Sequence, residues 1–285
     1  MHATEPIALA RIERAAAPRR RTAPWLALYA PIPFRRELAL GVLAWIAFVA
    51  LWYGIVGGGY AQAKLLPYPH QVASALVELV WERGFLADVL VSIRRIFVSF
   101  AIAAAVAVPL GVLMGAFYGV EAAVNPLVSP ARYLPAPSFA PLLLMWLGTG
   151  DSQKVALLVI GVIWFLITLV ADHVRTLRRE LLETALTLGA DRRRALFRVV
   201  LPESLPGIVV ALRQMLAVSW TYLVIAEIIA ATDGIGAMMM RAKRFVHTDE
   251  IMAGIVTIGL LGIAFDLLFR LLHRWSFPYL YLDEA

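Results

Sequence analysis

Long apolar runs alternate with short polar segments along this chain. Each run approaches or exceeds the roughly 17 to 25 residues that a helix needs to cross the hydrocarbon core of a bilayer. The runs lie at about 38–56, 96–117, 127–147, 155–171, 208–231 and 251–272. The pattern therefore predicts an all-α polytopic membrane protein with six transmembrane helices.

The third run is interrupted by prolines at positions 126, 130, 135, 137 and 141. A proline beyond the first turn of a helix removes a backbone donor and clashes with the carbonyl four residues earlier, so we expect this helix to be broken or strongly kinked. Irregular backbone at membrane depth is tolerated where it is buried in protein or faces a watery cavity. Tyr133, Ser138 and Met145 are therefore candidates for the wall of a pathway. A kink that serves packing alone is the alternative.

Two shorter amphipathic stretches, 67–83 and 238–246, are too brief and too charged to cross. We expect both to lie at the outer surface. Arg241, Lys243 and Arg244 in the second stretch either attract an anionic solute or an acidic partner, or extend from an interfacial helix toward water.

Small residues recur at every fourth position of the second run and predict a smooth ridge on which another helix packs closely. They are Ala103, Ala107, Gly111, Gly115 and Gly119.

Arg213, Trp220 and Glu227 are spaced by seven in the fifth run, so they share one stripe of the helix. Arg213 and Glu227 lie roughly 21 Å apart along it and each needs a partner elsewhere. Trp220 and Glu227 are further pathway candidates. Glu227 either serves the pathway or binds backbone donors of the turn at 233–236.

The sequence spacing suggests ion-pair partners for two other carboxylates, Asp266 and Asp172. Asp266 and Arg270 have the order and spacing of a helical ion pair. Asp172 lies where it can meet the arginines that follow the fourth run.

Composition agrees with a membrane protein. The 285 residues are 61% hydrophobic and 16% charged, which lies outside the range of soluble domains. There is no cysteine, which excludes disulfides and cysteine-ligated metals. The net charge of +6 comes from arginines clustered beside apolar runs, a placement that favours control of topology over nucleic-acid binding.

The arginine blocks predict the orientation. One precedes the first run and the other fills the loop after the fourth, so both fall on the same side of six spans, and the positive-inside rule makes that side cytoplasmic with both termini. A cleaved signal peptide ending near Ala61-Gln62-Ala63 is the alternative, but the first run is longer than a typical signal core.

Motifs for enzyme chemistry fail on closer inspection. Gly148-Thr-Gly-Asp151 matches the GxGD pattern of intramembrane aspartyl proteases, but the next aspartate, Asp172, lies about 30 Å away at helical rise, too far for a catalytic pair. The sequence contains no P-loop and no histidine pair at metal-ligand spacing. An ion-coupled secondary transporter is the alternative function, although paired broken helices in matching halves are not evident.

The polar segment 183–202 reads ETALTLGADRRRALFRVVLP. Leu181, Leu182, Ala185 and Leu188 form an apolar stripe on a helix of about three turns. Gly189 allows a sharp bend, and Pro202 is predicted to end a second short helix. An amphipathic helix lying on lipid explains the stripe, but not the glycine and Leu-Pro at their offsets.

This segment closely resembles the EAA loop of ABC importer permeases. Stretches at 66–69, 92–95, 109–111, 135–150, 226–227 and 259–266 look like permeases for nitrate, sulfonate, taurine and bicarbonate. Thr184 and Val199 depart mildly from the usual Ala and Ile, and Asp172 stands where Asn is common.

The resemblance implies a type I ABC importer transmembrane fold in a bacterial inner membrane. It implies a basic cytoplasmic arm at 1–37, a permease domain at 38–275 with its coupling loop at 178–202, and a cytoplasmic tail at 276–285. Gly111 and Gly115 are expected at helix contacts. The residues expected to couple to an ATPase are Glu183, Ala185, Leu188, Gly189, Leu201 and Pro202.

By the same resemblance, two copies form the pathway, two cytoplasmic ATPases bind the coupling loops, and an extracytoplasmic binding protein delivers the solute. ATP and Mg are expected in the ATPase, so this chain is expected to bind no cofactor and to be no enzyme. Oxyanions, sulfonates, bicarbonate, aromatic acids and thiamine precursors remain open as solutes.

Overall fold

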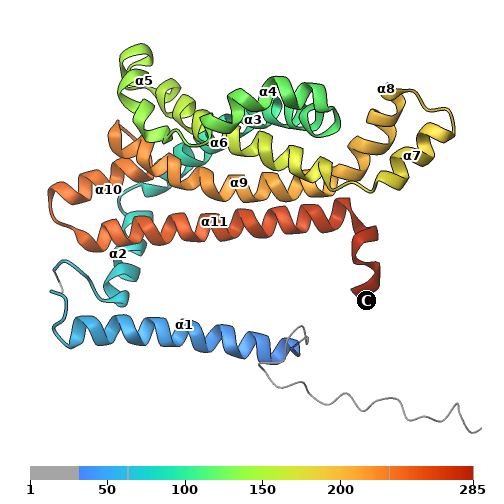
Figure 1. Cartoon of the computed structure of the whole chain (residues 1–285). Helices are drawn as coiled ribbons and strands as arrows, with labels where there is room; N and C mark the ends of the chain where they lie inside the picture. The colour runs from blue at the N-terminus through green and yellow to red at the C-terminus, as the bar shows by residue number, and fades with distance from the viewer. Residues whose placement is uncertain (1–31, 63, 231, 285) are drawn as a thin grey trace, which may run out of the picture. The chain divides into compact units, whose positions relative to one another are not determined.

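The computed structural model describes residues 32–284 except 63 and 231, and all the regular structure in this part is helical (Figure 1). This confirms the all-α class. The chain divides into two units, one ending at Ala61 and the other beginning at Gln62.

The first unit contains one helix, α1 (Phe34–Gly57). It begins after Pro33, slightly before the predicted run, and its apolar side chains are exposed nearly all round. A helix that is apolar on every face is typical of a membrane span. Most of the predicted basic arm at 1–37 lies outside the described residues.

The second unit is built mainly from four long helices, α3, α6, α9 and α11, and the shorter ones between them. Its elements are α2 (Pro69–Trp81), α3 (Phe85–Ala116), α4 (Tyr118–Ala131), η2 (Ala136–Phe139), α5 (Ala140–Leu147), α6 (Asp151–Arg175), α7 (Arg179–Thr187), α8 (Arg192–Ala195), η3 (Leu196–Val200), α9 (Leu201–Ile229), α10 (Ile235–Arg244), α11 (Thr248–Ser276) and η4 (Pro278–Glu284).

Five helices in the described part of the chain are long and apolar enough to cross a membrane: α1, α3, α6, α11 and the continuous helical segment Arg192–Ile229 that ends with α9. The predicted third span is divided into α4, η2 and α5. The helix is broken after Ala131, with Pro135 in the break, Pro137 in η2 and Pro141 in the first turn of α5, which confirms that prolines interrupt this run. Pro126 and Pro130, which were also expected to interrupt it, lie inside α4.

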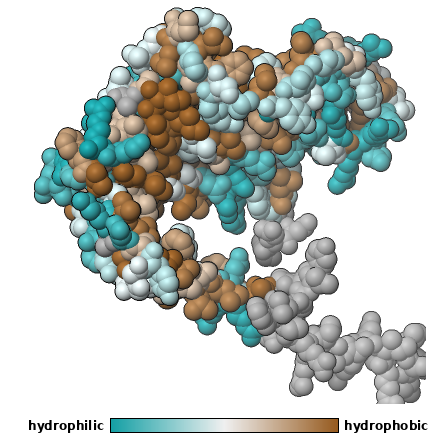
Figure 2. Space-filling model, turned by 60° about the vertical axis from the view of Figure 1, so that its left-hand side comes forward, coloured by the Kyte–Doolittle hydropathy of each residue, from teal (hydrophilic) through white to brown (hydrophobic). Residues whose placement is uncertain are grey.

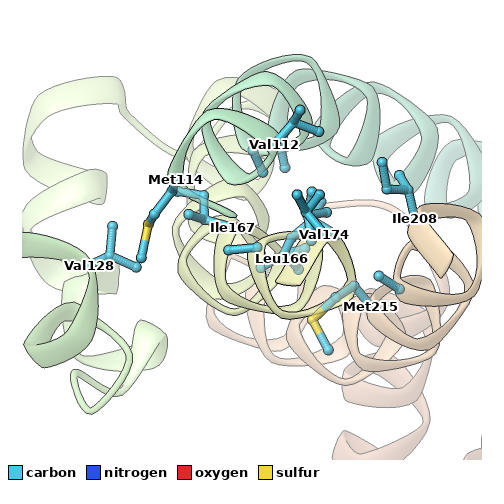
Figure 3. Close-up of a cluster of buried hydrophobic side chains, with 14 of the residues drawn as sticks. Val112, Met114, Val128, Leu166, Ile167, Val174, Ile208 and Met215 are labelled. Atoms are coloured by element: carbon cyan, nitrogen blue, oxygen red, sulfur yellow. The ribbon is translucent and has the colours of Figure 1, made fainter. Parts of the chain in front are cut away.

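The core of the second unit lies where α6 packs between α3 and α9. Figure 3 shows Val112 of α3, Leu166, Ile167 and Val174 of α6, and Ile208 of α9 in one cluster of buried side chains. Aliphatic side chains dominate this cluster, as expected where close packing holds membrane helices together.

The small-residue ridge of α3 faces α6. A Cβ atom added to Gly111 would lie 2.7 Å from Val170 Cβ and 2.8 Å from the Ile167 carbonyl oxygen, and Gly115 is equally crowded by Val174. The prediction is wrong for Gly119, which has open space around it because α3 ends at Ala116 and the chain turns at Phe117 before α4.

The predicted amphipathic stretches form α2 and α10, and α10 begins at Ile235, slightly earlier than expected. Both pack against α11. Figure 2 shows broad apolar areas flanked by clusters of hydrophilic side chains, the surface expected of a membrane-embedded helical protein.

Candidate functional site

The predicted coupling segment is an exposed helix at one end of the second unit. Figure 1 places α7 and α8 at the end of α9 opposite to α10. No residue of α7 is buried, and beyond its end Leu188 is 83% exposed. Apolar side chains exposed in a polar, arginine-rich region are typical of a contact surface.

Other leucines of this region hold the segment in place. Leu177, Leu182, Leu196 and Leu201 pack against the core cluster between α3, α6 and α9. The predicted stripe is therefore divided. Leu182 contacts the core, whereas Leu181 and Leu188 remain exposed.

Gly189 makes the predicted bend. Its φ is +85°, its N–H donates to the Leu186 carbonyl at 3.0 Å, and the Ala190 N–H donates to the Ala185 carbonyl at 3.0 Å. This pair of bonds is the Schellman motif that ends a helix through a residue in the left-handed region, where glycine has no Cβ to clash. The Gly189 prediction is confirmed in its structural part.

The prediction that Pro202 ends a second short helix is wrong. Asp191 caps α8 through a bond from the Arg194 N–H at 2.7 Å, and the helix then continues through the π-turn η3 into α9. Pro202 lies at the start of α9, directly after this π-turn. A wider π-turn accommodates a proline that would clash in a regular helix, so the segment passes into α9 without a break.

Glu183 and Thr184 are exposed on α7. The Thr184 hydroxyl donates to the Glu180 carbonyl at 2.7 Å, so its polar atom is satisfied within the helix. This bond explains why threonine is acceptable where the resembling loops usually have alanine.

A buried ion cluster lies at the opposite end of α9. Arg95 of α3 and Glu227 of α9 have side chains that are 1% and 0% exposed, and Arg95 Nη1 donates to Glu227 Oε1 at 2.8 Å. Such a pair at membrane depth is expensive unless every polar atom has a partner.

Glu227 has partners for both carboxylate oxygens. Oε1 also accepts from the Ser92 hydroxyl at 2.8 Å, and Oε2 accepts from the Gly236 N–H at 2.9 Å. The latter bond confirms that Glu227 reaches the turn at 233–236. The carboxylate thereby satisfies a free donor at the positive end of α10, and this geometry supports a structural role.

Asp88 and Ser92 of α3 complete this cap. Asp88 accepts from the Gly234 N–H at 2.8 Å and also pairs with Arg241. The Ser92 hydroxyl accepts from the Ile235 N–H at 3.0 Å. The first backbone donors of α10 are therefore held by side chains of α3 and α9.

Asp233 links the cluster to α6. It accepts hydrogen bonds from Arg95, from Thr232 at 2.7 Å and from Lys154 at 3.2 Å. Partial burial by itself raises the pKa of Asp233, but these three donors outweigh it and hold the pKa well below its usual range. Lys154 is fully buried, so this bond supplies its counter-charge.

Sequence reasoning missed Arg95, Lys154 and Asp233 as members of one site. Ser92-Ile-Arg-Arg95 stood out as part of a family resemblance, without a role for its arginines. The available signal was an arginine pair at the start of a long apolar run, because ionisable residues at such positions need partners.

The pathway candidates fall into two sets. Tyr133, Ser138 and Met145 are exposed around the break between α4 and α5. Trp220 is buried in α9, where it stacks on Phe265 of α11 with ring centroids 5.8 Å apart. A pathway role for these residues stays a prediction.

The predicted ion pairs of Asp266 and Asp172 form, and Arg213 has a partner on another helix. Arg213 Nε lies 3.1 Å from Asp266 Oδ1, and Arg270 Nε lies 2.7 Å from Asp266 Oδ2, so Asp266 joins α9 to α11. Asp172 lies 3.3 Å from Arg175.

Protease chemistry has no support in this geometry. Asp151 begins α6 and pairs with Arg94 and Arg95, while Asp172 lies nearly a helix length away, about 32 Å at helical rise. Within the described residues, no group of three His, Cys, Asp or Glu side chains is placed to hold a metal ion.

Comparison with known proteins gives consistent matches. Residues 107–279 match the family described as "Binding-protein-dependent transport system inner membrane component". The taurine transport system permease protein TauC of Escherichia coli is 29% identical over 252 residues, covering 87% of this chain and 92% of that protein. A probable ABC transporter permease protein of Brucella melitensis is 33% identical over 239 residues, covering 83% and 95%.

Solved structures agree on the fold. The inward-facing MetNI methionine ABC transporter has a chain that matches with a TM-score of 0.56 and 21% identity, over 65% of this chain and 94% of that one.

Proposed function

The chain belongs to the family of binding-protein-dependent transport system inner membrane components, the permease subunits of ABC transporters, and we propose that it carries a small organic sulfonate such as taurine. The similarity to the taurine permease, over most of both chains, supports this solute class. The resemblance to permeases for nitrate and bicarbonate makes those anions the competing solutes.

The exposed helix α7 is the observation that supports a separate ATPase as the energy source for transport. Leu181 on α7 and Leu188 just beyond its end are exposed, and Leu182 packs this segment against the core. Because the sequence contains no P-loop, ATP hydrolysis requires a separate subunit. We infer that an ATPase binds α7.

The connection from α7 to α9 offers a route for coupling. A short turn at Gly189 and the unbroken segment Arg192–Ile229 join the contact surface to the buried core. A displacement of α7 therefore moves the inner end of α9, which packs against α6. ATP drives transport only if the ATPase contacts α7 differently in the two states, since equal contacts shift no equilibrium.

The break between α4 and α5 supports a pathway shared by two copies. Tyr133 and Ser138 are exposed beside irregular backbone. Lipid cannot satisfy the polar groups of such backbone, whereas a second permease or a watery passage can. We therefore propose that this segment faces the partner copy and the solute.

The arginine distribution supports an orientation with α7 in the cytoplasm. The segment between α6 and α9 carries Arg178, Arg179, Arg192, Arg193, Arg194 and Arg198. Positive charges in short loops favour the cytoplasmic side. In this orientation α10 and the ion cluster lie at the extracytoplasmic end, and both termini are cytoplasmic.

Uptake by a reconstituted complex tests the proposal. The permease is placed in proteoliposomes with an ATPase and a solute-binding protein from the same organism, and accumulation of labelled taurine, nitrate and bicarbonate is measured with and without ATP. We expect ATP-dependent uptake of taurine that disappears with an ATPase unable to hydrolyse ATP. Preferred uptake of nitrate or bicarbonate would overturn the solute class. Uptake driven by an ion gradient without the ATPase would overturn the mechanism.

A further inference from the structure

The turn between α10 and α11 contains a strained residue. Val246 has a φ of +60° and is the one non-glycine residue in the described part of the chain with a positive φ. A β-branched side chain is disfavoured in this region because its Cβ crowds the backbone. Strain of this kind persists where the surrounding structure enforces it.

The same turn motif occurs twice in this chain with different residues. After α10, the Val246 N–H donates to the Lys243 carbonyl at 3.1 Å and the His247 N–H donates to the Ala242 carbonyl at 3.0 Å. This is the bonding pattern found at Gly189. Glycine is the favourable residue at the left-handed position, so Val246 stands where a more stable alternative exists. Departures of this kind are expected where a side chain serves a function.

The side chains at the turn form an exposed apolar knob with positive charge beside it. Phe245 is 73% exposed and Val246 is 49% exposed. Lys243 and Arg244 are exposed and have no ion-pair partner among the described residues, whereas Arg241 is paired with Asp88. The knob, Phe245 and Val246, is therefore accompanied by two uncompensated cations.

The turn is held rigidly from neighbouring helices. His247 Nδ1 lies 2.7 Å from Glu250 Oε1, which also accepts from Arg83 Nη1 beyond α2 at 2.8 Å. Beside the knob lies a recess of about 410 Å³, lined in part by Leu79, Arg83, Met238 and His247. A fixed projection next to a recess presents a shape that a protein surface can complement.

We propose that this knob, with Lys243 and Arg244, docks the extracytoplasmic solute-binding protein, whose contact surface carries an acidic rim around an apolar recess. This inference rests on the proposed function, which places α10 outside. A protein is favoured over lipid for two reasons. The surface potential that attracts basic segments belongs mainly to the cytoplasmic leaflet. A fluid lipid interface also does not need a projection of fixed shape, whereas a protein partner with a complementary surface binds more tightly to the fixed geometry at Val246.

Titration of the assembled transporter with its binding protein tests the inference. The permease–ATPase complex in nanodiscs is titrated with binding protein loaded with taurine, and the concentration giving half-maximal stimulation of ATP hydrolysis is measured. We expect Phe245→Ser and the double variant Lys243→Glu/Arg244→Glu each to raise this concentration about tenfold. Added salt should weaken docking of the native complex more than docking of the double variant.

Val246→Gly separates docking from stability. Because glycine relieves the backbone strain, we expect this variant to unfold at the same or a higher temperature, yet to need about five times more binding protein. Trp81→Ala, which removes an equally exposed aromatic side chain from neighbouring α2, serves as the control and should dock normally.

The possible results distinguish this inference from the function on which it rests. Native docking by all turn variants would overturn the inference alone. Normal docking together with lost binding to phosphatidylglycerol vesicles would assign the turn to lipid. A defect in Trp81→Ala as large as that in Phe245→Ser would also overturn it. No stimulation of the native complex by any loaded binding protein would instead contradict the proposed function.

Discussion

Arg95 of α3 donates a hydrogen bond of 2.8 Å to Glu227 of α9, and both side chains are almost completely buried. These residues lie far apart in the sequence and in different apolar runs. Their pairing fixes the end of α9 against α3, and through Gly236 it also fixes the start of α10. The end of the second unit opposite the coupling segment is therefore held by charge as well as by packing.

Removing Arg95 leaves the buried Glu227 carboxylate without a cationic partner, whereas removing Glu227 leaves Arg95 paired with Asp151 and Asp233. We expect Arg95→Ala to destabilise the protein by roughly 3–5 kcal/mol, and Glu227→Ala to destabilise it less, both measured as a lower unfolding temperature in detergent. The double variant Arg95→Met/Glu227→Met should recover much of the loss, because the Glu227 carboxylate is then no longer buried without a cation. A double variant as unstable as the sum of the single variants would contradict this interpretation.

Gly189 has a conformation that other residues adopt with difficulty. Gly189→Pro cannot reach the observed φ of +85°, and Glu183→Lys reverses an exposed charge on α7. We expect both variants to insert into the membrane normally and to lose binding-protein-stimulated ATP hydrolysis in the assembled complex. Gly148→Ala, also at a glycine of positive φ but distant in sequence from α7, is the control for backbone strain. Normal stimulation in both coupling variants would argue against the coupling role.

Gly111 lies where α3 closely approaches the backbone of α6. A Cβ there would meet the Ile167 carbonyl oxygen at 2.8 Å, and backbone cannot move aside as a flexible side chain can. We expect Gly111→Ala to destabilise the protein by about 1–3 kcal/mol. Gly119→Ala is the matched control, because nothing lies within 4 Å of its added Cβ and alanine favours helix. Equal stability of the two variants, measured by thermal unfolding, would show that the packing of α3 against α6 does not require glycine at position 111.

Asp233 gives the protein an acid-sensitive contribution to stability. Burial opposes ionisation, but bonds from Arg95, Thr232 and Lys154 keep the pKa of Asp233 below its usual value. A carboxyl whose pKa is lowered on folding stabilises the folded state fully above its unfolded pKa, about 3.9, and this stabilisation is lost progressively as the pH falls below that value.

Replacement of Asp233 by asparagine should therefore lower the unfolding temperature at pH 7 and leave a smaller further loss on acidification to pH 3. The measurement is a set of thermal unfolding curves of both proteins across this range. Parallel curves with the same loss on acidification would show that other carboxylates account for the acid sensitivity.

The hydrophobic pattern determined much of the fold. Apolar runs of bilayer length predicted the long helices, because a segment in lipid must satisfy its backbone internally. Prolines 135, 137 and 141 predicted the break between α4 and α5, and Gly189 predicted the bend after α7. Each of these depends on the local chemistry of a few residues, which a single sequence displays.

At two other places the local chemistry of the sequence led to a wrong prediction of the backbone path. Pro202 was expected to end a helix, yet a π-turn carries the helix past it. Gly119 was expected to extend the ridge of α3, yet the chain has already turned into α4. Both errors arose because a proline or a periodic glycine is compatible with more than one backbone path.

Sequence by itself determined that the chain is a helical membrane protein, and its motifs identified the class of transporter to which it belongs. Tertiary structure alone decided that Arg95, Asp151, Lys154, Glu227 and Asp233 form one ion cluster, and that Val246 rather than glycine takes a left-handed turn. The physical reason is that charges in separate apolar runs each need a partner, but periodicity orients a side chain only about its own helix. Which charges meet is set by how α3, α6 and α9 pack against one another.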